Sequence, residues 1–293
     1  MERPRSTTPR ATRPVNPNAV ERAKKLTVLR SEDAALEELF SRTPIESAYM
    51  LGDLDPAYAH GCTWFALDEE PLKSVLLLYS ALSAPTLLSE GNLEDLEAII
   101  IGAWEQIPRR VYFQMPEAHS EVMSAFFRVS KARDMLRMGL SKSEDPPCKR
   151  SENVVALSHL DTGDIMALYQ HYPDNFFEPS LLNTGMYFGI RVNSVLVSVA
   201  GIHQLSETKG IAAVGNIVTH PEHRGLGYAT VCVSHLVSEL LERVDDIALN
   251  VAASNESAIR CYESVGFKNK YRFKEGWAQP CLKRYLFLKP TLS

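Results

Sequence analysis

Apolar residues recur along the last third of the chain with two different periods, and these periods predict alternating strands and helices. From Tyr228 to Val244 the apolar positions form one stripe at a spacing of three or four residues, which is typical of an amphipathic helix. The short apolar runs at 211–218 and 247–252 have the length and the β-branched composition of buried strands. This region therefore predicts a strand–helix–strand unit.

The same reasoning predicts the elements around this unit. Two alternating runs, 186–191 and 195–205, predict a hairpin that turns at Val192-Asn193. A helix over 256–265 is expected to begin at the capping residue Asn255 and to end at Gly266. Further elements are a strand at 154–160, a helix capped by Asp161, and strands at 267–275 and 283–288 that close the sheet.

An earlier region has a similar rhythm, so the chain divides into two α/β parts. We expect helices at 32–41 and 92–105 and strands at 63–67, 74–79, 111–114 and 134–138. The polar stretch after Ser141, with two adjacent prolines, is typical of a linker. The predicted units are a disordered basic tail (1–25), a first half (26–142), a linker (143–152) and a second half (153–293). The string from Tyr49 to Asp55 is distinctive, but the sequence suggests no chemistry for it.

A glycine-rich loop opens the amphipathic helix of the second half. It reads Arg224-Gly-Leu-Gly-Tyr-Ala229, an R-x-x-G-x-A pattern. Glycines allow a close backbone approach, and the free N–H groups at a helix N-terminus favour an anion such as phosphate. A Walker loop needs Gly-Lys-Ser/Thr, which is absent, and Thr230 stands where a dinucleotide fingerprint has its third glycine.

A second motif follows the next strand: Asn255, Ala258, Ile259, Tyr262, Gly266 and Phe267 give N-x-x-A-I-x-x-Y-x-x-x-G-F. The two motifs in this order and spacing resemble the GNAT superfamily of N-acetyltransferases over about residues 153–290. The resemblance implies a central mixed sheet flanked by helices. The first half carries neither motif, so it is interpreted either as a degenerate GNAT-like half without a cofactor site, as in tandem members of the superfamily, or as an unrelated α/β cap.

The resemblance also implies a reaction, the transfer of an acetyl group from acetyl-CoA to a primary amine of a small molecule or peptide. The alternatives are a longer acyl-CoA as donor, or a CoA-binding regulatory module without turnover. In this family pattern a strand and the glycine loop hold the cofactor, and an asparagine bonds the pantetheine. The cofactor-binding residues expected on this basis are Ile217, Val218, Thr219, Arg224, Gly225, Leu226, Gly227, Tyr228, Ala229 and Asn255.

Tyr262 holds the motif position that protonates the departing thiolate, although its place on an apolar stripe is equally consistent with packing. The strand 211–219 contains no Asp or Glu to act as a general base. His203 on the preceding strand is the candidate, because an imidazole has an ordinary pKa of about 6.5. Glu275 and Asp174 are weaker candidates. Aromatic residues in the loop 169–178 are expected either to line an acceptor cleft or simply to pack.

Composition narrows the partners and the compartment. The net charge of −5 argues against a nucleic-acid surface, and no apolar run approaches the roughly 20 residues of a membrane span. Five scattered cysteines without a C-x-x-C pair, and histidines at 220 and 223 without H-E-x-x-H spacing, predict reduced thiols, no metal and a cytoplasmic protein. We expect a monomer or homodimer, and a fragment that starts near Ser151 and retains cofactor binding.

Overall fold

The structure is a computed structural model that describes residues 16–81, 84–173 and 177–281. The strands of the first half are β1 (Leu26–Leu29), β2 (Cys62–Leu67), β3 (Val75–Tyr79), β4 (Thr86–Glu90), β5 (Val111–Met115) and β6 (Phe127–Ser141). Its helices are α1 (Pro17–Ala23), α2 (Ala34–Ser41), α3 (Ala48–Gly52), α4 (Pro56–Ala59), α5 (Leu93–Gly102) and α6 (Glu117–Phe126).

The second half continues the pattern. Its strands are β7 (Val155–Ala156), β8 (Phe188–Val192), β9 (Val195–Ser206), β10 (Ile211–Thr219), β11 (Asp246–Ala252) and β12 (Lys268–Pro280). Its α-helices are α7 (Thr162–Tyr169), α8 (Tyr228–Leu240) and α9 (Glu256–Val265). Short 3₁₀ turns are η1 (Lys142–Glu144), η2 (His159–Asp161), η3 (Pro179–Thr184) and η4 (Pro221–His223).

All twelve described strands form one mixed sheet in the order β1-β2-β3-β4-β5-β12-β6-β11-β10-β9-β8-β7. Only β4–β5 and β10–β11 pair in parallel among these strands, and each of those pairs is joined by a crossover helix. The element order strand–helix–strand–helix–strand therefore occurs twice, as β4-α5-β5-α6-β6 and as β10-α8-β11-α9-β12. The predicted mixed α/β fold is confirmed, and its two halves repeat one arrangement.

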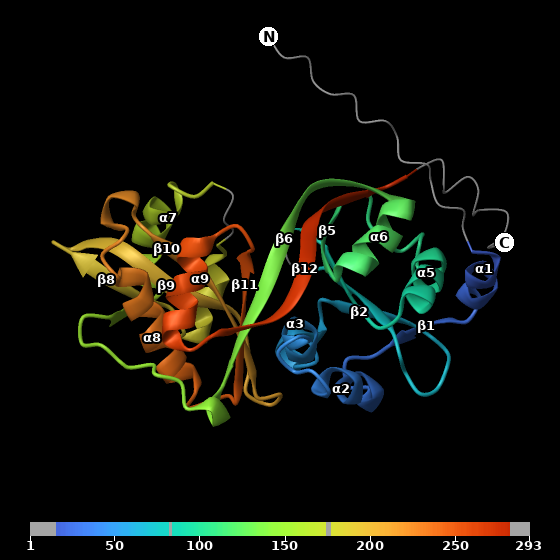
Figure 1. Ribbon diagram of the computed structural model, residues 1–293, viewed down its shortest axis with the longest axis horizontal. Helices are drawn as coiled ribbons and strands as arrows, with labels where there is room; N and C mark the ends of the chain where they lie inside the picture. Colours follow the sequence, from blue (N-terminus) through green and yellow to red (C-terminus); the bar gives the residue numbers. More distant parts are fainter. Residues whose placement is uncertain (1–15, 82–83, 174–176, 282–293) are drawn as a thin grey trace, which may run out of the picture.

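The two halves share their closing strands. Residues 135–141 of β6 pair with 246–252 of β11, and β12 pairs with both β5 and β6 of the first half. Figure 1 shows β6 and β12 as long strands that cross the middle of the molecule between the two groups of helices. The expectation that 267–275 closes the sheet of the second half alone is wrong, because a first-half strand already occupies the free edge of β11. The predicted strand 283–288 lies outside the described residues.

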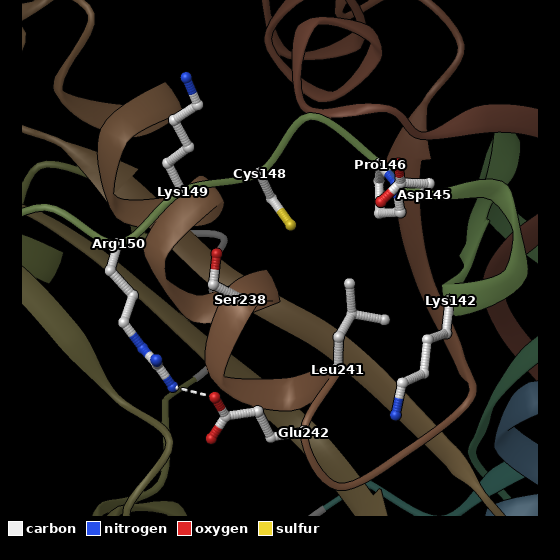
Figure 2. A pocket seen from close by; sticks show the side chains of 9 residues that line it. All are labelled: Lys142, Asp145, Pro146, Cys148, Lys149, Arg150, Ser238, Leu241 and Glu242. Carbon is white, nitrogen blue, oxygen red and sulfur yellow. Dashed lines mark hydrogen bonds and ion pairs between the residues drawn. The ribbon is translucent and has the colours of Figure 1, made fainter.

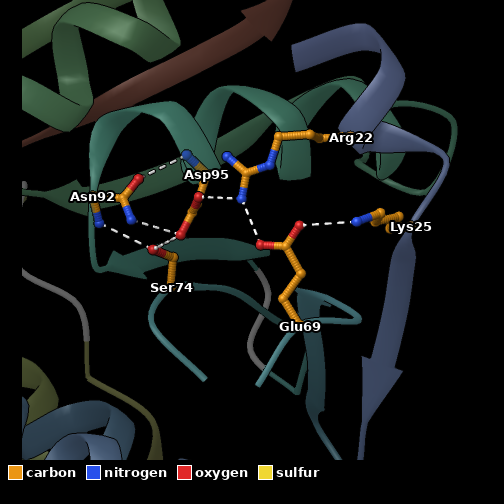
Figure 3. A network of polar contacts seen from close by, with 6 residues as sticks. All are labelled: Arg22, Lys25, Glu69, Ser74, Asn92 and Asp95. Atoms are coloured by element: carbon orange, nitrogen blue, oxygen red, sulfur yellow. Dashed lines mark hydrogen bonds and ion pairs between the residues drawn. The ribbon is translucent and has the colours of Figure 1, made fainter. Parts of the chain in front are cut away.

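The start of the described chain is helical, which corrects the expected disordered tail at 1–25. Asn16 caps α1 and Pro17 stands in its first turn, where the missing N–H of proline has no effect. Arg22 of α1 forms ion pairs with Glu69 (2.8 Å) and with Asp95 on α5 (2.6 Å), as Figure 3 shows. Residues 1–15 lie outside the described part of the chain.

The entry to the second half also differs from expectation. The predicted strand 154–160 is reduced to the two-residue β7, because Ser158 and Asp161 form a capping box that starts a 3₁₀ turn. Asp161 therefore bonds Ser158 and pairs with Arg191 (2.7 Å) instead of capping α7. The hairpin is present, and its turn lies at Asn193-Ser194, which both have positive φ.

The string from Tyr49 to Asp55 forms the contact between the halves. Helix α3 packs on β9 and β10. The Asp53 carboxyl accepts a hydrogen bond from Gln204 Nε2 (2.6 Å), and Asp55 accepts one from Ser206 Oγ (2.7 Å). The sequence suggested no chemistry for this string, and the structure assigns it a position over the sheet of the second half.

The linker after β6 lies along α8 and is held there. The Lys149 N–H donates to Ser234 Oγ (2.7 Å), and Arg150 pairs with Glu242 (2.6 Å). Figure 2 shows the hollow of about 500 Å³ that the linker forms with the last turn of this helix. The glycine-rich loop opens the other end of the same helix, so this hollow is separate from the predicted phosphate site. Among the described residues, no helix is long and apolar enough to cross a membrane.

Candidate active site

The parallel strands β10 and β11 separate halfway along their length. They pair from Ile211–Asp246 to Val214–Leu249, and β10 continues to Thr219 without its parallel neighbour. A bulge between β10 and β9 begins here, and Asn216 in it has a positive φ of 54°. The unpaired edge of residues 215–219 therefore faces an opening in the sheet, where backbone groups are available to an extended ligand.

The glycine loop at the end of β10 is open. Gly225 and Gly227 have φ angles of 76° and 82°, a backbone region that L side chains rarely adopt. Among the described residues, no heavy atom outside the two chain neighbours lies within 4 Å of a Cβ placed on either glycine. Leu226 between them is 62% exposed. The loop therefore presents bare backbone to solvent, as the sequence predicted.

The donors of this loop are unused by the rest of the described chain. None of the backbone N–H groups of residues 225–230 has an acceptor among the described residues, and Val231 makes the first bond, to the Gly227 carbonyl. Gly227 is the N-cap residue of α8 and has no side chain to satisfy the first turn. Unpaired N–H donors at the positive end of a 13-residue helix are the arrangement that favours an anion.

Arg224 beside the loop is positioned by an aromatic residue that the sequence did not single out. Its Nε and one terminal nitrogen donate to the Tyr172 hydroxyl (3.2 and 2.7 Å), and the guanidinium lies 5.2 Å from the centre of that ring. The Tyr172 hydroxyl in turn donates to the carbonyl of Thr219. Arg224 thus adds a positive charge next to the free N–H groups while its side chain remains exposed.

Histidines surround the same loop. The ring of His220 lies 4.5 Å from that of His171 and 5.4 Å from that of His223, measured between ring centres. His223 Nδ1 is buried and has no hydrogen-bond partner in the described part of the chain. The described residues contain no group of His, Cys, Asp and Glu that could hold a metal ion.

Asn255 is the N-cap residue of α9, and Tyr262 lies within this helix. Helix α9 follows β11, one of the two strands that separate at the opening. Asn255 caps the helix by accepting from the Ala258 N–H (3.2 Å), so the predicted capping role is confirmed. Tyr262 is 7% exposed and packs edge-on against Phe267. Burial raises the pKa of the Tyr262 hydroxyl. This keeps the hydroxyl protonated at neutral pH, which a proton donor requires, and the packing role considered for Tyr262 is present as well.

His203 lies where the two halves meet. A Cβ added to Gly215 would come within 2.0 Å of its Nε2 atom, so the ring lies directly against the start of the β10 bulge. The Tyr49 ring of α3 is 6.4 Å away on the other side. His203 is exposed to solvent, but many protein atoms surround its ring. The resulting desolvation disfavours the charged imidazolium and lowers the pKa of His203 to about 4. The imidazole is therefore neutral at pH 7 and able to accept a hydrogen bond.

The remaining candidate residues form other contacts or lie outside the described residues. Glu275 is buried in an ion pair with Arg133 (2.8 Å). Asp174 lies outside the described residues, as does Phe176 of the proposed acceptor loop. Phe177 packs near Tyr169 and Tyr187, at 5.4 and 5.7 Å between ring centres, which is consistent with the packing interpretation.

Residues 155–267 match the model of the Acetyltransferase (GNAT) family. This segment of the second half is therefore a GNAT acetyltransferase domain. The matched segment contains β10, the glycine loop, α8, β11 and α9, so the open sheet edge and the free helix N-terminus lie in the part that defines the family. The resemblance in the motifs is thereby confirmed.

Known proteins similar to this chain include a curated protein and several solved structures. An uncharacterized protein of Mycobacterium leprae is 36% identical over 101 residues, which are 33% of this chain and 27% of that protein. A GCN5-related N-acetyltransferase of Sphaerobacter thermophilus is 15% identical with a TM-score of 0.57, and covers 87% of this chain and 95% of its own. A tandem GNAT protein from the clavulanic acid biosynthesis pathway, with a TM-score of 0.52 and 13% identity, covers 87% and 98%. The last two likenesses establish the fold across both halves.

The sequence missed the residues that support the site from a distance. Tyr187 accepts from Asn216 Nδ2 (2.7 Å) and so fixes the bulge, and Tyr49 and Arg137 of the first half lie beside His203 and Asn250. The positive φ at Asn216 has one sequence signal, an Asn after a Gly within an apolar strand. The others depend on contacts between distant segments, and no local pattern predicts those.

Proposed function

We propose that this protein is an N-acetyltransferase that transfers the acetyl group of acetyl-CoA to a primary amine. The observation that carries the proposal is the loop of residues 225–230, whose backbone N–H groups have no acceptor among the described residues at the start of α8. The loop stands next to a parallel strand pair that opens, within a segment that matches an acetyltransferase family.

The residues present fit such a co-substrate. The N–H groups of Gly225–Ala229 and the guanidinium of Arg224 would hold the pyrophosphate, because they are fixed donors with positive potential. The backbone of Ile217, Val218 and Thr219, on the edge of β10 that faces away from β9, would bond the pantetheine arm in the manner of an added strand. The Asn255 amide, whose oxygen caps α9, retains its NH₂ group for a further bond. When bound, acetyl-CoA supplies an activated acetyl thioester.

Groups of the chain itself would stabilise the negative charge that develops during the transfer and would exchange the protons. A backbone N–H of Ile217 or Val218, on the edge that lacks a strand partner, would stabilise negative charge on the carbonyl oxygen. The Tyr262 hydroxyl would give its proton to the departing sulfur. Its raised pKa keeps that proton in place until a strong base forms beside it.

His203 would receive the proton that the amine loses, directly or through a water molecule. Its ring lies against Gly215, where β10 and β11 separate, and its lowered pKa keeps it neutral. A neutral imidazole accepts a hydrogen bond from an incoming amine and does not repel an ammonium group. The same low pKa makes His203 a weak base, so its contribution is expected to be smaller than that of Tyr262.

Release of free thiol from acetyl-CoA, measured against a panel of amino acids, polyamines, aminoglycosides and peptides, tests the proposal. Wild-type protein is expected to release thiol in proportion to at least one amine, with the N-acetyl product visible by mass spectrometry. Gly227→Asp should abolish release, because its carboxylate would repel the phosphates and its φ of 82° strains any side chain. Thiol release that is equal in the variant would contradict the assigned loop, and cofactor binding without release from any amine would indicate a non-catalytic module.

A further inference from the structure

A second cavity, of about 220 Å³, lies in the first half close to its contact with the second. It is formed by the connection between α2 and α3, the ends of β4 and β5, and the middle of β6 and β12. The polar and aromatic residues that line it are Glu46, Ser47, Glu90, Gln114, Arg137 and Tyr271. At about 30 Å³ for each water-sized group, the cavity has room for roughly seven such groups, the size of a small metabolite.

Arg137 is the unusual member of this lining. It is 4% exposed, and the rings of Tyr49, Phe273 and Tyr271 lie 4.9, 5.2 and 5.9 Å from its guanidinium carbon. No carboxylate of the described residues forms an ion pair with it. The carboxyl groups of Glu46 and Glu90 lie near enough to interact with its charge but form no ion pair with it, so the guanidinium keeps donors for an anion that enters the cavity.

The hydrogen bonds of Arg137 lead to the same conclusion. Its Nε donates to Asn250 Oδ1 (3.0 Å) and a terminal nitrogen donates to the Glu46 carbonyl, which uses two of the five guanidinium donors. Both acceptors are neutral. Arg133, four residues earlier on the same strand, is paired with Glu275 at 2.8 Å. Arg137 on the same strand therefore lacks, among the described residues, the direct ion pair that Arg133 forms.

The remaining cavity groups suit an anion that is planar and small. Gln114 accepts from Asn250 Nδ2 (3.3 Å) through its oxygen, and its own NH₂ group has no acceptor among the described residues. Glu90 accepts from Ser47 Oγ (2.6 Å), and burial raises the pKa of its carboxyl. A carboxylate matches the fork of a guanidinium with two parallel bonds, and an amide donor beside it adds a third.

The cavity adjoins the opening of the second half. Asn250, which bonds Arg137, follows directly after Leu249, the last residue of β11 that pairs with β10. Alternate residues of a strand share a face, so Asn250 points to the same side as Ala248, which packs in the first-half core cluster. The Tyr49 ring lies between Arg137 and His203, and His203 contacts Gly215. A molecule held at Arg137 is therefore on the same side of the sheet as Tyr49 and close to His203.

We propose that Arg137 binds the carboxylate of the acceptor, so that the acetylated amine belongs to an amino acid or another small molecule with both groups. This inference rests on the proposed acetyltransferase function and names its substrate class. In this arrangement the first half supplies the site for the carboxylate and the second half the site for the acetyl donor. The string from Tyr49 to Asp55 connects the two sites.

Matched pairs of acceptors test this inference in the full-length protein. Each pair is an amino acid and its amide, for example glycine and glycinamide, β-alanine and β-alaninamide, and each kcat/KM is expressed per concentration of free amine, because the amide has the less basic amine. The acid of the preferred pair is expected to have a kcat/KM at least 100-fold above that of its amide. In Arg137→Gln this preference should fall to within threefold, with the KM for acetyl-CoA unchanged. An equal rate for acid and amide in the wild type, or an intact preference in Arg137→Gln, would overturn the inference.

A second variant covers the case in which Arg137→Gln does not fold. Gln114→Glu keeps the acceptor oxygen for Asn250 and adds a carboxylate beside Arg137, which would compete with the ligand. The same loss of preference is expected, and a preference that survives in a folded Gln114→Glu protein speaks against the site.

Acetyl-CoA binding, measured on the same samples by calorimetry, separates this inference from the proposed function. Intact acetyl-CoA binding with turnover of amides and acids alike overturns the carboxylate site alone. Absence of acetyl-CoA binding overturns the proposed function. If amino acids then still bind in a way that depends on Arg137, the cavity is a binding site without a role in acetyl transfer, and the acceptor assignment is overturned.

Discussion

The junctions β4–α5 and β10–α8 occupy equivalent positions in the repeated element order. The N-terminus of the helix is capped by a side chain in the first junction and is not capped by one in the second. In the first half a two-residue turn, Gly91-Asn92, leads into α5. Asn92 caps that helix by accepting from the Asp95 N–H (2.9 Å), and Glu94 and Asp95 place negative charge in its first turn. Figure 3 shows this junction filled by the chain's own side chains.

In the second half the corresponding junction is longer and its helix has no side-chain cap. Eight residues separate β10 from α8, two of them glycines with positive φ, and no acidic residue stands in the first turn. The first half thus satisfies the helix N-terminus internally, whereas the second leaves it for an external anion. The same element order therefore gives a closed structural junction in one half and an open binding junction in the other.

The exchanged strands make the two halves dependent on each other, and truncation should have the largest effect. A fragment of residues 151–293 loses β6, which pairs with both β11 and β12. In contrast to the sequence-based expectation of a fragment that binds the cofactor, we expect it to be unfolded or aggregated, without the cooperative thermal transition of the full chain by circular dichroism. A fragment of residues 127–293, which retains β6, is the control and should recover more structure. A folded 151–293 fragment that binds acetyl-CoA would show that the second half is independent after all.

Tyr262→Phe tests the chemistry of the open half. Removal of one general acid typically lowers a rate by about 10²–10⁴-fold, and a loss in kcat within this range is expected with acetyl-CoA affinity nearly unchanged. Tyr112→Phe, which removes a partly buried hydroxyl from the first half, is the control and should retain the wild-type rate. Equal kcat values for Tyr262→Phe and wild type, with chemistry rate-limiting, would leave Tyr262 as a packing residue.

His203 should titrate well below an ordinary histidine. Its NMR titration is expected to have a midpoint near pH 4, because the surrounding protein favours the neutral ring. The folded pKa lies below the unfolded value of about 6.5, so its contribution to stability is present above pH 6.5 and is lost as the pH falls toward 4. His203→Gln should flatten this dependence in chemical denaturation at pH 5 and pH 7. A midpoint near 6.5 would contradict the lowered pKa of His203.

Asp53 in the contact between the halves should give the smallest effect. Burial raises the pKa of its carboxyl well above the ordinary range, while Gln204 donates to it at 2.6 Å. Because the folded protein retains a proton that the unfolded chain releases, the stability from this group falls as the pH rises above about 3.8. Asp53→Asn keeps the acceptor and removes the titration, so its stability relative to wild type should increase between pH 5 and pH 8. A relative stability that is constant over this range would contradict a buried protonated Asp53.

The sequence predicted the local parts of the structure and missed those that join distant segments. The helix 256–265, its cap at Asn255 and its end at Gly266 follow from neighbours in the chain, and the structure confirms them. The strand partners of β12 do not follow from neighbours in the chain, because an alternating strand carries no signal for which half it will join. Arg137 was likewise missed, since its environment is made by α3, β11 and β12 together.

Calorimetric titration of the full chain with acetyl-CoA tests the comparison of the two junctions most directly. The account predicts one binding site per chain. Gly227→Asp in the open junction should abolish binding, whereas Asn92→Asp, which adds a charge at the closed junction and keeps its capping oxygen, should leave it unchanged. Two sites per chain, or a single site lost in Asn92→Asp and retained in Gly227→Asp, would contradict the assignment of the binding junction to the second half.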